Sequence, residues 1–198
     1  MVRKSMLICV LMILLALSAC GGARKDDPQR QALALRTDYL AADGCTAKLT
    51  VKADYGQRVY TYGVDVTVTG GESVLTVTSP AELAGITARV TDGQSQLEYD
   101  GAVLETGPRS GDGLTPLSAV PALLECARFG FIDSCTMEWL GERDTLRMQC
   151  RDPELSAGQG REVALWFDLA SRGLVQGEIA VDGYRVILCE FESFTLNQ

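Results

Sequence analysis

The sequence predicts a mainly β protein of the α+β class, with one curled antiparallel sheet of about eleven strands that forms a half-barrel. Three observations support this. Apolar and polar residues alternate from Cys45 almost to the C-terminus, two-residue turn sequences recur between the alternating runs, and only two segments have helical spacing. Because strands twist, so large a sheet does not stay flat. We expect the two helices to cover its concave, apolar face.

The N-terminal segment has the features of a secretory signal peptide. Arg3 and Lys4 precede an apolar run over 6–17, and small residues follow it. The run is shorter than the roughly 20 residues that a bilayer span needs. We therefore expect an exported chain.

The Leu-Ser-Ala-Cys sequence that ends at Cys20 resembles the lipobox of bacterial lipoproteins. The resemblance implies cleavage before Cys20 and a lipid on its sulfur. Residues 1–19 would then be removed, and residues 20–27 would form a lipidated tether on the outer side of the cell membrane. An uncleaved anchor and a signal peptide without lipid are the alternatives.

The mature chain would be strongly acidic. Cleavage removes two basic residues and leaves 16 against 26 acidic ones. Such a chain has no electrostatic basis for binding nucleic acid or an anionic lipid surface. We expect contact with the membrane through the N-terminal lipid, and no nucleic-acid partner.

Two helices are predicted, over 28–40 and 115–127. Pro28 suits the first position of the earlier helix, whereas Pro121 lies inside the later one. The candidate N-caps are Asp26 or Asp27 for the first helix and Thr115 or Ser118 for the second.

The remaining chain divides into strands at short turn sequences such as Gly70-Gly71. The predicted strands are 45–53, 58–69, 73–79, 86–91, 95–99, 102–106, 131–140, 144–151, 162–168, 174–181 and 184–195. Folding the chain at the turns places apolar residues of neighbouring strands on one face. The predicted cross-strand pairs are Val64–Val77, Val66–Leu75, Ile86–Tyr99, Ala88–Leu97, Leu97–Leu104, Met137–Met148, Trp139–Leu146, Ile179–Val186 and Val181–Tyr184.

Five cysteines follow Cys20 in the mature chain. A turn at Glu142-Arg143 places Cys135 opposite Cys150, within the Cα separation that a disulfide tolerates, so we predict that bridge. Cys45 and Cys189 could pair if the curl brings them together. The chain has no CxxC sequence and no His, so a thiolate zinc site is not expected.

The order of these elements resembles the LolA/LolB-like fold of the outer membrane lipoprotein-sorting superfamily. The resemblance covers 28–197 and rests on the opening helix, VYTYGVDVTV, VLTVTSPAELAGITARVTDGQSQLEYDG, the inserted GLTPLSAVPALLE and the closing WFDLASRGLV. It implies a single domain over 28–198. Members of that family bind acyl chains between the half-barrel and its helices, and some tethered relatives act through a partner enzyme.

Two functions follow from this resemblance. The first is binding of a hydrophobic or lipid ligand in the cavity of the half-barrel. The residues that would line this cavity are Tyr62, Val64, Val66, Leu75, Val77, Ala88, Leu97, Leu117, Leu123, Trp139 and Trp166. Large apolar residues of a sheet are more often ordinary core, and that is the alternative for each of them. The alternative is an envelope or spore-germination type of interaction protein that supports a partner such as a cell-wall enzyme. A continuous cavity favours the first function, and a filled core with an exposed apolar edge favours the second.

Catalysis is not expected. The sequence has no GxSxG motif, no phosphate-binding glycine loop and no His, which is the commonest general base. A pair of acidic residues could act as a glycosidase dyad, and the candidates are Glu138, Glu142, Asp144, Asp152, Glu154, Glu190 and Glu192. Such residues more often form a solvated face, and Glu190 and Glu192 alternate as the outward face of a strand does. No cofactor and no metal are predicted.

Overall fold

The computed structural model describes residues 27–91, 94–108 and 112–197. The predicted signal peptide, Cys20 and most of the tether lie outside these residues. The elements are α2 (Pro28–Ala41), β1 (Gly44–Asp54), β2 (Val59–Thr69), β3 (Glu72–Ser79), a 3-10 turn η2 (Ala81–Leu83), β4 (Thr87–Thr91), β5 (Gln94–Tyr99), β6 (Ala102–Pro108), α3 (Pro116–Phe129), β7 (Ile132–Leu140), β8 (Arg143–Arg151), β9 (Arg161–Asp168), β10 (Leu174–Val181) and β11 (Tyr184–Asn197).

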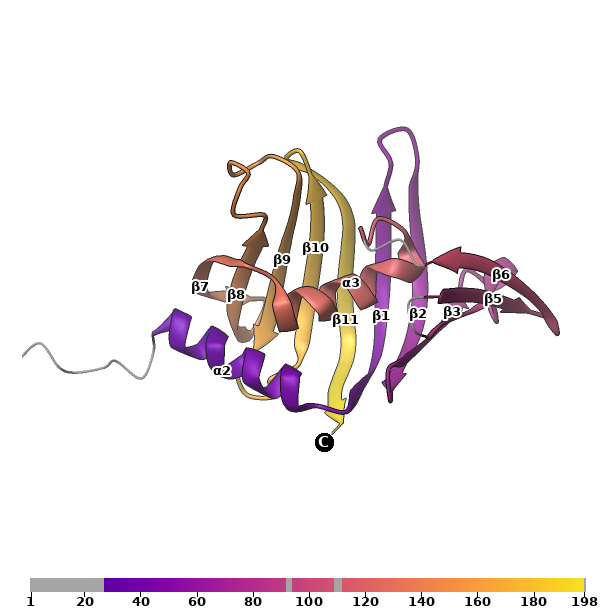
Figure 1. Cartoon of the computed structure of the whole chain (residues 1–198), viewed down its shortest axis with the longest axis horizontal. Coiled ribbons are helices and arrows are strands. Elements are labelled where there is room, and N and C mark those ends of the chain that lie inside the picture. The colour runs from indigo at the N-terminus through magenta and orange to yellow at the C-terminus, as the bar shows by residue number, and fades with distance from the viewer. Residues whose placement is uncertain (1–26, 92–93, 109–111, 198) are drawn as a thin grey trace, which may run out of the picture.

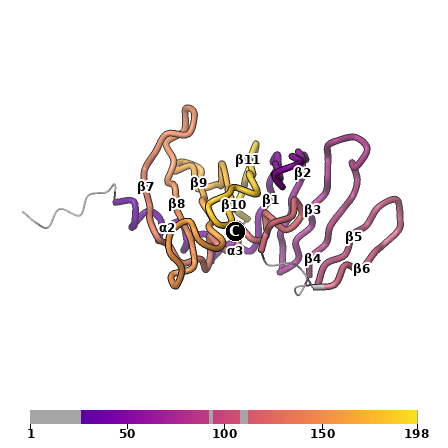
Figure 2. Tube along the Cα trace, turned by 90° about the horizontal axis from the view of Figure 1, so that it is seen from above, coloured from indigo at the N-terminus to yellow at the C-terminus, as the bar shows by residue number. Residues whose placement is uncertain are grey.

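All eleven strands form one antiparallel sheet in the order β6-β5-β4-β3-β2-β1-β11-β10-β9-β8-β7 (Figure 1). The first and last strands pair in the middle of the sheet, so they join two meanders. The view from above shows that the strands follow an arc that does not close (Figure 2). The predicted half-barrel of eleven strands is therefore confirmed.

Both helices lie across the same face of the sheet (Figure 1). Asp27 caps α2 by accepting a hydrogen bond from the backbone N–H of Gln29, and Pro28 occupies the first position. Thr115 and Ser118 form a reciprocal capping box at the start of α3. Of the described helices, none has the length and apolar character needed to cross a membrane.

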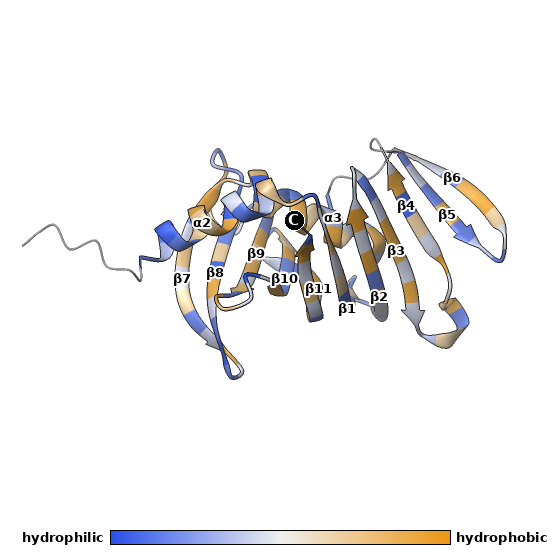
Figure 3. Cartoon of the chain, turned by 90° about the horizontal axis from the view of Figure 1, so that it is seen from below, coloured by the Kyte–Doolittle hydropathy of each residue, from blue (hydrophilic) through white to orange (hydrophobic). Residues whose placement is uncertain are grey.

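The core lies between the helices and the sheet face that they cover. Apolar and polar residues alternate along the strands, as the hydropathy colouring shows (Figure 3). Leu75, Leu123 and Leu165 are fully buried in the same cluster, although they come from β3, α3 and β9. Arg36 of α2 fixes the helices to each other, because its guanidinium donates to the carbonyls of Ala127 and Gly130.

The predicted strands match the observed ones within two residues at each end. The pairs Val64–Val77, Val66–Leu75, Ala88–Leu97, Leu97–Leu104 and Val181–Tyr184 are confirmed. The prediction for Ile179 is wrong, because a bulge before Ala180 places it opposite Ile187. Ile86 precedes β4 and has no place in the β4–β5 ladder.

The predicted register of β7 and β8 is wrong by two residues. The turn lies at Gly141-Glu142, where Gly141 has a φ of +62°, so Leu140 pairs with Arg143. Met137 therefore lies opposite Leu146, and Trp139 lies opposite Asp144. Because a slip of two residues leaves every side chain on its own face, the apolar pattern could not distinguish the two registers.

Candidate binding surface

Most of the predicted lining residues belong to a packed core. Val64, Val66, Leu75, Val77, Ala88 and Leu123 have exposed fractions of only 0–6%. A cavity wide enough to hold water or ligand would leave accessible surface on its walls. We conclude that α3 fills the concave face at these described positions, where Ala88 alone also borders a small pocket.

Neither tryptophan belongs to the packed core of the concave face. Trp166 lies on the opposite face of β9, where it packs with Ala164 and Val175. Its indole N–H donates to the carboxylate of Glu138, and the Arg147 guanidinium lies 5.2 Å from the centre of its ring. The assignment failed because β9 is buried on both faces, so apolar character alone does not identify the concave one.

Trp139 is 72% exposed near the end of β7. The predicted partner, Leu146, is buried, but the observed partner is Asp144. Trp139 is on the same face of β7 as Met137, which packs against the core, but near the end of the strand its partner Asp144 is exposed as well.

Three predicted lining residues do meet at an opening. Ala88, Leu97 and Leu117 line a pocket of about 200 Å³ between the start of α3 and strands β4 to β6. Ser95 and Thr106 supply its polar rim, and the hydroxyl groups of these two residues are hydrogen-bonded to each other.

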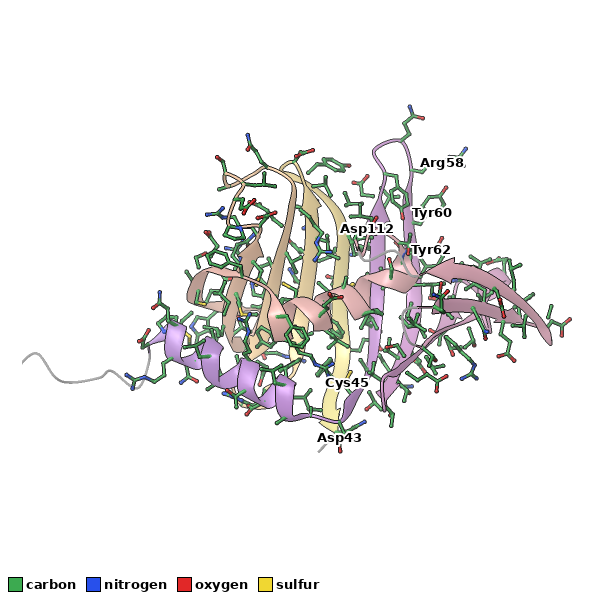
Figure 4. The ribbon with its side chains drawn as sticks, viewed as in Figure 1. Asp43, Cys45, Arg58, Tyr60, Tyr62 and Asp112 are labelled. Atoms are coloured by element: carbon green, nitrogen blue, oxygen red, sulfur yellow. The ribbon has the colours of Figure 1, made fainter. Side chains whose placement is uncertain are left out.

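Tyr62, the remaining predicted residue, belongs to a row of tyrosines. Its ring stacks on that of Tyr60 with centroids 6.4 Å apart, and Tyr60 approaches Tyr55 at 6.1 Å. Figure 4 shows Tyr60 and Tyr62 along β2, beyond α3 and far from Cys45. The Tyr55 hydroxyl donates to the carbonyl of Leu114, so this row ties the β1–β2 hairpin to the segment before α3.

One row of apolar residues crosses five strands, and its last residue lies outside the part of the sheet that α3 covers. The register aligns Val66, Leu75, Ala88, Leu97 and Leu104, which we call the β2–β6 row. The first three are buried and Leu97 is half-buried, whereas Leu104 is 64% exposed. The row thus begins in the core and ends at β6 in contact with solvent.

Strands β4 to β6, residues 87–91 and 94–108, form what we call the wing. It projects beyond the helices at one end of the sheet (Figure 1), and β6 is the terminal strand of the sheet order. No described side chain of β6 is buried, and Val103 is exposed on the face opposite Leu104. The outer backbone edge of β6 is therefore open to pairing with another strand.

The wing is acidic. Its described residues include three acidic ones, Glu98, Asp100 and Glu105, and one basic one, Arg89. Arg89 lies 3.4 Å from Glu98 and 3.7 Å from Glu72. The exposed apolar edge consequently carries a negative field, which favours a basic partner.

The predicted disulfide between Cys135 and Cys150 is not formed, and the five described cysteines are free thiols. Cys135 lies opposite Met148, while Cys150 pairs with Ile132. Nor do Cys45 and Cys189 pair, because Cys189 lies opposite Val51, six residues further along β1.

Two thiols meet instead at a second pocket, which we call the α3–β8 pocket. It has a volume of about 430 Å³, and its walls include Cys126, Cys150, Phe129, Arg151 and Arg161. A hydrogen bond from the Cys150 thiol lowers the pKa of Cys126, and the same bond, together with burial, raises the pKa of Cys150. Cys126 was missed, although its helical spacing of three from Leu123 indicates an inward position.

The acidic pair Glu190 and Glu192 lies on an exposed strand face. Glu190 accepts a hydrogen bond from the Lys52 ammonium at 2.8 Å, and the Lys52 and Glu190 side chains are both about half exposed. This is the geometry of a surface ion pair, and nothing in it resembles a closed site with two carboxylates.

Comparison with solved structures shows similarity of fold. An uncharacterized conserved protein from Thermus thermophilus is 11% identical, with a TM-score of 0.51 over 87% of this chain and 90% of the other. The LolA superfamily protein NE2245 from Nitrosomonas europaea is also 11% identical, with a TM-score of 0.45 and coverages of 86% and 94%. Lipoprotein LppX from Mycobacterium tuberculosis is 14% identical, with a TM-score of 0.48 and coverages of 86% and 97%.

No protein-family model matches the sequence, and no curated protein matches it. At these identities, structural similarity concerns the fold alone. The fold of this chain is the curled antiparallel sheet with an N-terminal and an inserted helix that the sequence predicts.

Proposed function

We propose that this chain is a non-catalytic lipoprotein, anchored through Cys20 on the outer side of the cell membrane, that binds and supports a partner protein of the envelope. The observation that carries the proposal is the β2–β6 row, which is buried under α3 at Leu75 and exposed at Leu104. The filled concave face supports the same choice, because a half-barrel that stores a lipid needs a cavity there.

The proposed docking surface is the wing, and the proposed occupant is an extended segment of the partner. Such a segment would add a strand to the open edge of β6 and cover Leu104 with alternate apolar side chains. Between those side chains it would carry Lys or Arg, because Glu98, Asp100 and Glu105 give the wing its negative charge. The other terminal strand, β7, is a poorer candidate since α2 packs beside it, around Ile132 and Cys135.

Site-specific photo-crosslinking of the full-length protein in its own membrane tests this proposal. A photoreactive residue at Leu104 should capture a discrete partner, while one at Trp139 provides a matched control on the opposite sheet edge with similar exposure. The change Leu104→Arg should lower recovery of that partner at least tenfold without altering expression. Equal capture from both edges, or none from Leu104, would contradict the proposal.

A second candidate function is binding of a single acyl chain in the pocket formed by Ala88, Leu97 and Leu117. These are three of the residues that the LolA-like resemblance predicts as ligand-lining. Uptake of a fluorescent fatty acid by delipidated protein would measure it. Leu117→Trp should abolish the uptake by filling the pocket, whereas Leu33→Trp, on the exposed side of α2, should not.

A further inference from the structure

Two buried thiols from distant parts of the chain meet at the base of the α3–β8 pocket. Cys126 lies on α3 and Cys150 lies on β8, and their exposed fractions are 5% and 3%. Both side chains line this pocket and belong to the same core cluster. Gly130 packs closely against Cys126, because a Cβ at that position would lie 2.7 Å from the Cys126 sulfur. The fold therefore brings the two thiols to one pocket before any bond joins them.

The register explains why Cys126, rather than Cys135, is the partner of Cys150. Cys135 lies opposite Met148, so it is diagonal to Cys150 across the β7–β8 ladder. Diagonal neighbours in an antiparallel pair are about 7–8 Å apart, whereas a disulfide needs Cβ atoms about 3.5–4.5 Å apart. Among the described cysteines, Cys126 is the one that shares the α3–β8 pocket with Cys150.

We propose that Cys126 and Cys150 form a disulfide in the mature protein. In this step both S–H bonds break and one S–S bond forms, and the two protons and two electrons pass to the oxidant. The oxidant is the disulfide of a thiol-oxidising protein, which is reduced to its dithiol. The open α3–β8 pocket gives that disulfide its access, and exchange begins at Cys126, the thiol with the lower pKa.

The bond would fasten α3 to the sheet. In the described structure, packing and hydrogen bonds such as those from Arg36 hold α3 in place. A covalent link from its last turn to β8 would close the loop that contains β7 and reduce the freedom of the unfolded chain. It would also keep the helix layer fixed while the wing engages a partner.

Peptide mapping of the full-length, detergent-solubilised protein tests the bond directly. After blocking free thiols and digesting without reductant, the peptides of Cys126 and Cys150 should be recovered as one linked species, while Cys135 carries the blocking group. Because this arm uses protein from its native membrane, it also rests on the proposed location outside the cytoplasm. Recovery of both peptides with blocked thiols would overturn the proposal for the protein in the cell.

A second arm is independent of location. Fully reduced, purified protein is treated with oxidised glutathione, and the same two peptides should become linked, whereas Cys45 and Cys189 stay free. Oxidation should raise the melting temperature by about 5–10 °C for a loop of this size. The double variant C126A/C150A should show no such shift, and C135A should keep it. An equal shift in the double variant, or none in the wild type, would refute the pairing.

Discussion

Strands β9 and β6 belong to one sheet and have similar lengths, yet they differ in burial. Five consecutive residues of β9, 163–167, are buried, because α3 covers one face and the Trp166 cluster covers the other. No described side chain of β6 is buried. The apolar burial that stabilises this protein therefore lies mainly in the part of the sheet that α3 and the Trp166 cluster cover. Strand β6 contributes little to it and can be used for contact with another molecule.

The largest expected difference in stability is between alanine variants of two leucines in the β2–β6 row. Leu75→Ala should lower the free energy of unfolding by about 2–5 kcal/mol, because it leaves a cavity under α3. Leu104→Ala should change it by less than about 0.5 kcal/mol, because that side chain is already exposed. Urea denaturation of both variants measures the difference. Similar losses would show that the wing is part of the main core.

A turn in the covered part should give a smaller, pH-dependent effect. Asp168 accepts hydrogen bonds from the backbone N–H groups of Ala170 and Ser171 and from the Ser171 hydroxyl. Asp168→Ala should therefore cost about 1 kcal/mol at pH 7, as the loss of a helix cap does.

The backbone hydrogen bond from Ser171 is the main cause that lowers the pKa of Asp168. Since the folded pKa lies below the unfolded value of about 3.9, the carboxylate stabilises the fold above that pH. The contribution is lost as the pH falls through the folded pKa. The difference between wild type and Asp168→Ala should consequently narrow in urea titrations at pH 3, and a constant difference would contradict the assignment.

The N-cap of α3, Thr115, stands where the helix begins to cover the sheet. Thr115→Ala removes the side chain that accepts from the Ser118 N–H and should cost about 1 kcal/mol. Thr115→Ser should retain most of the stability, because its hydroxyl can make the same bond. Thermal denaturation of the pair measures this. If both variants lose stability equally, the Thr115 methyl group matters more than the cap.

The smallest effect is expected at the surface ion pair of Lys52 and Glu190. Both side chains are nearly half exposed, so Lys52→Gln should change the free energy of unfolding by less than about 0.5 kcal/mol. Whatever effect exists should fade in 1 M salt. A larger, salt-independent loss would show that the outward face of β1 and β11 carries more stability than its exposure indicates.

The alternation of apolar residues and the turn sequences sufficed to predict the strands, both helices and most registers. Failures occurred where two solutions leave the same side chains facing the core. The slip of two residues between β7 and β8 is such a case. The bulge at Ile179 differs, because it shifts β11 by one residue and places Ile187 instead of Val186 opposite Ile179, and both of these residues are apolar. Neither changes which residues are apolar, so the pattern contains no information about them.

The candidate surface was harder to predict than the fold. Leu75 is buried and Leu104 is exposed because α3 extends over one of them and not over the other. The residues next to each leucine in the chain do not indicate how far the helix extends over the sheet. The contact between Cys126 and Cys150 likewise depends on where a helix crosses a strand. Trp166 was placed on the wrong face because a strand covered on both sides has no alternation to interpret.

The central position of β11 has a consequence for how the molecule is made. A chain that emerges from the ribosome N-terminus first completes β1 early, but the neighbour of β1 on one side is the segment 184–197. Until that segment appears, the two meanders remain separate and β1 keeps an unsatisfied backbone edge. Translation stopped before residue 184 would therefore release two unjoined half-sheets, and the native sheet is completed only near the end of synthesis.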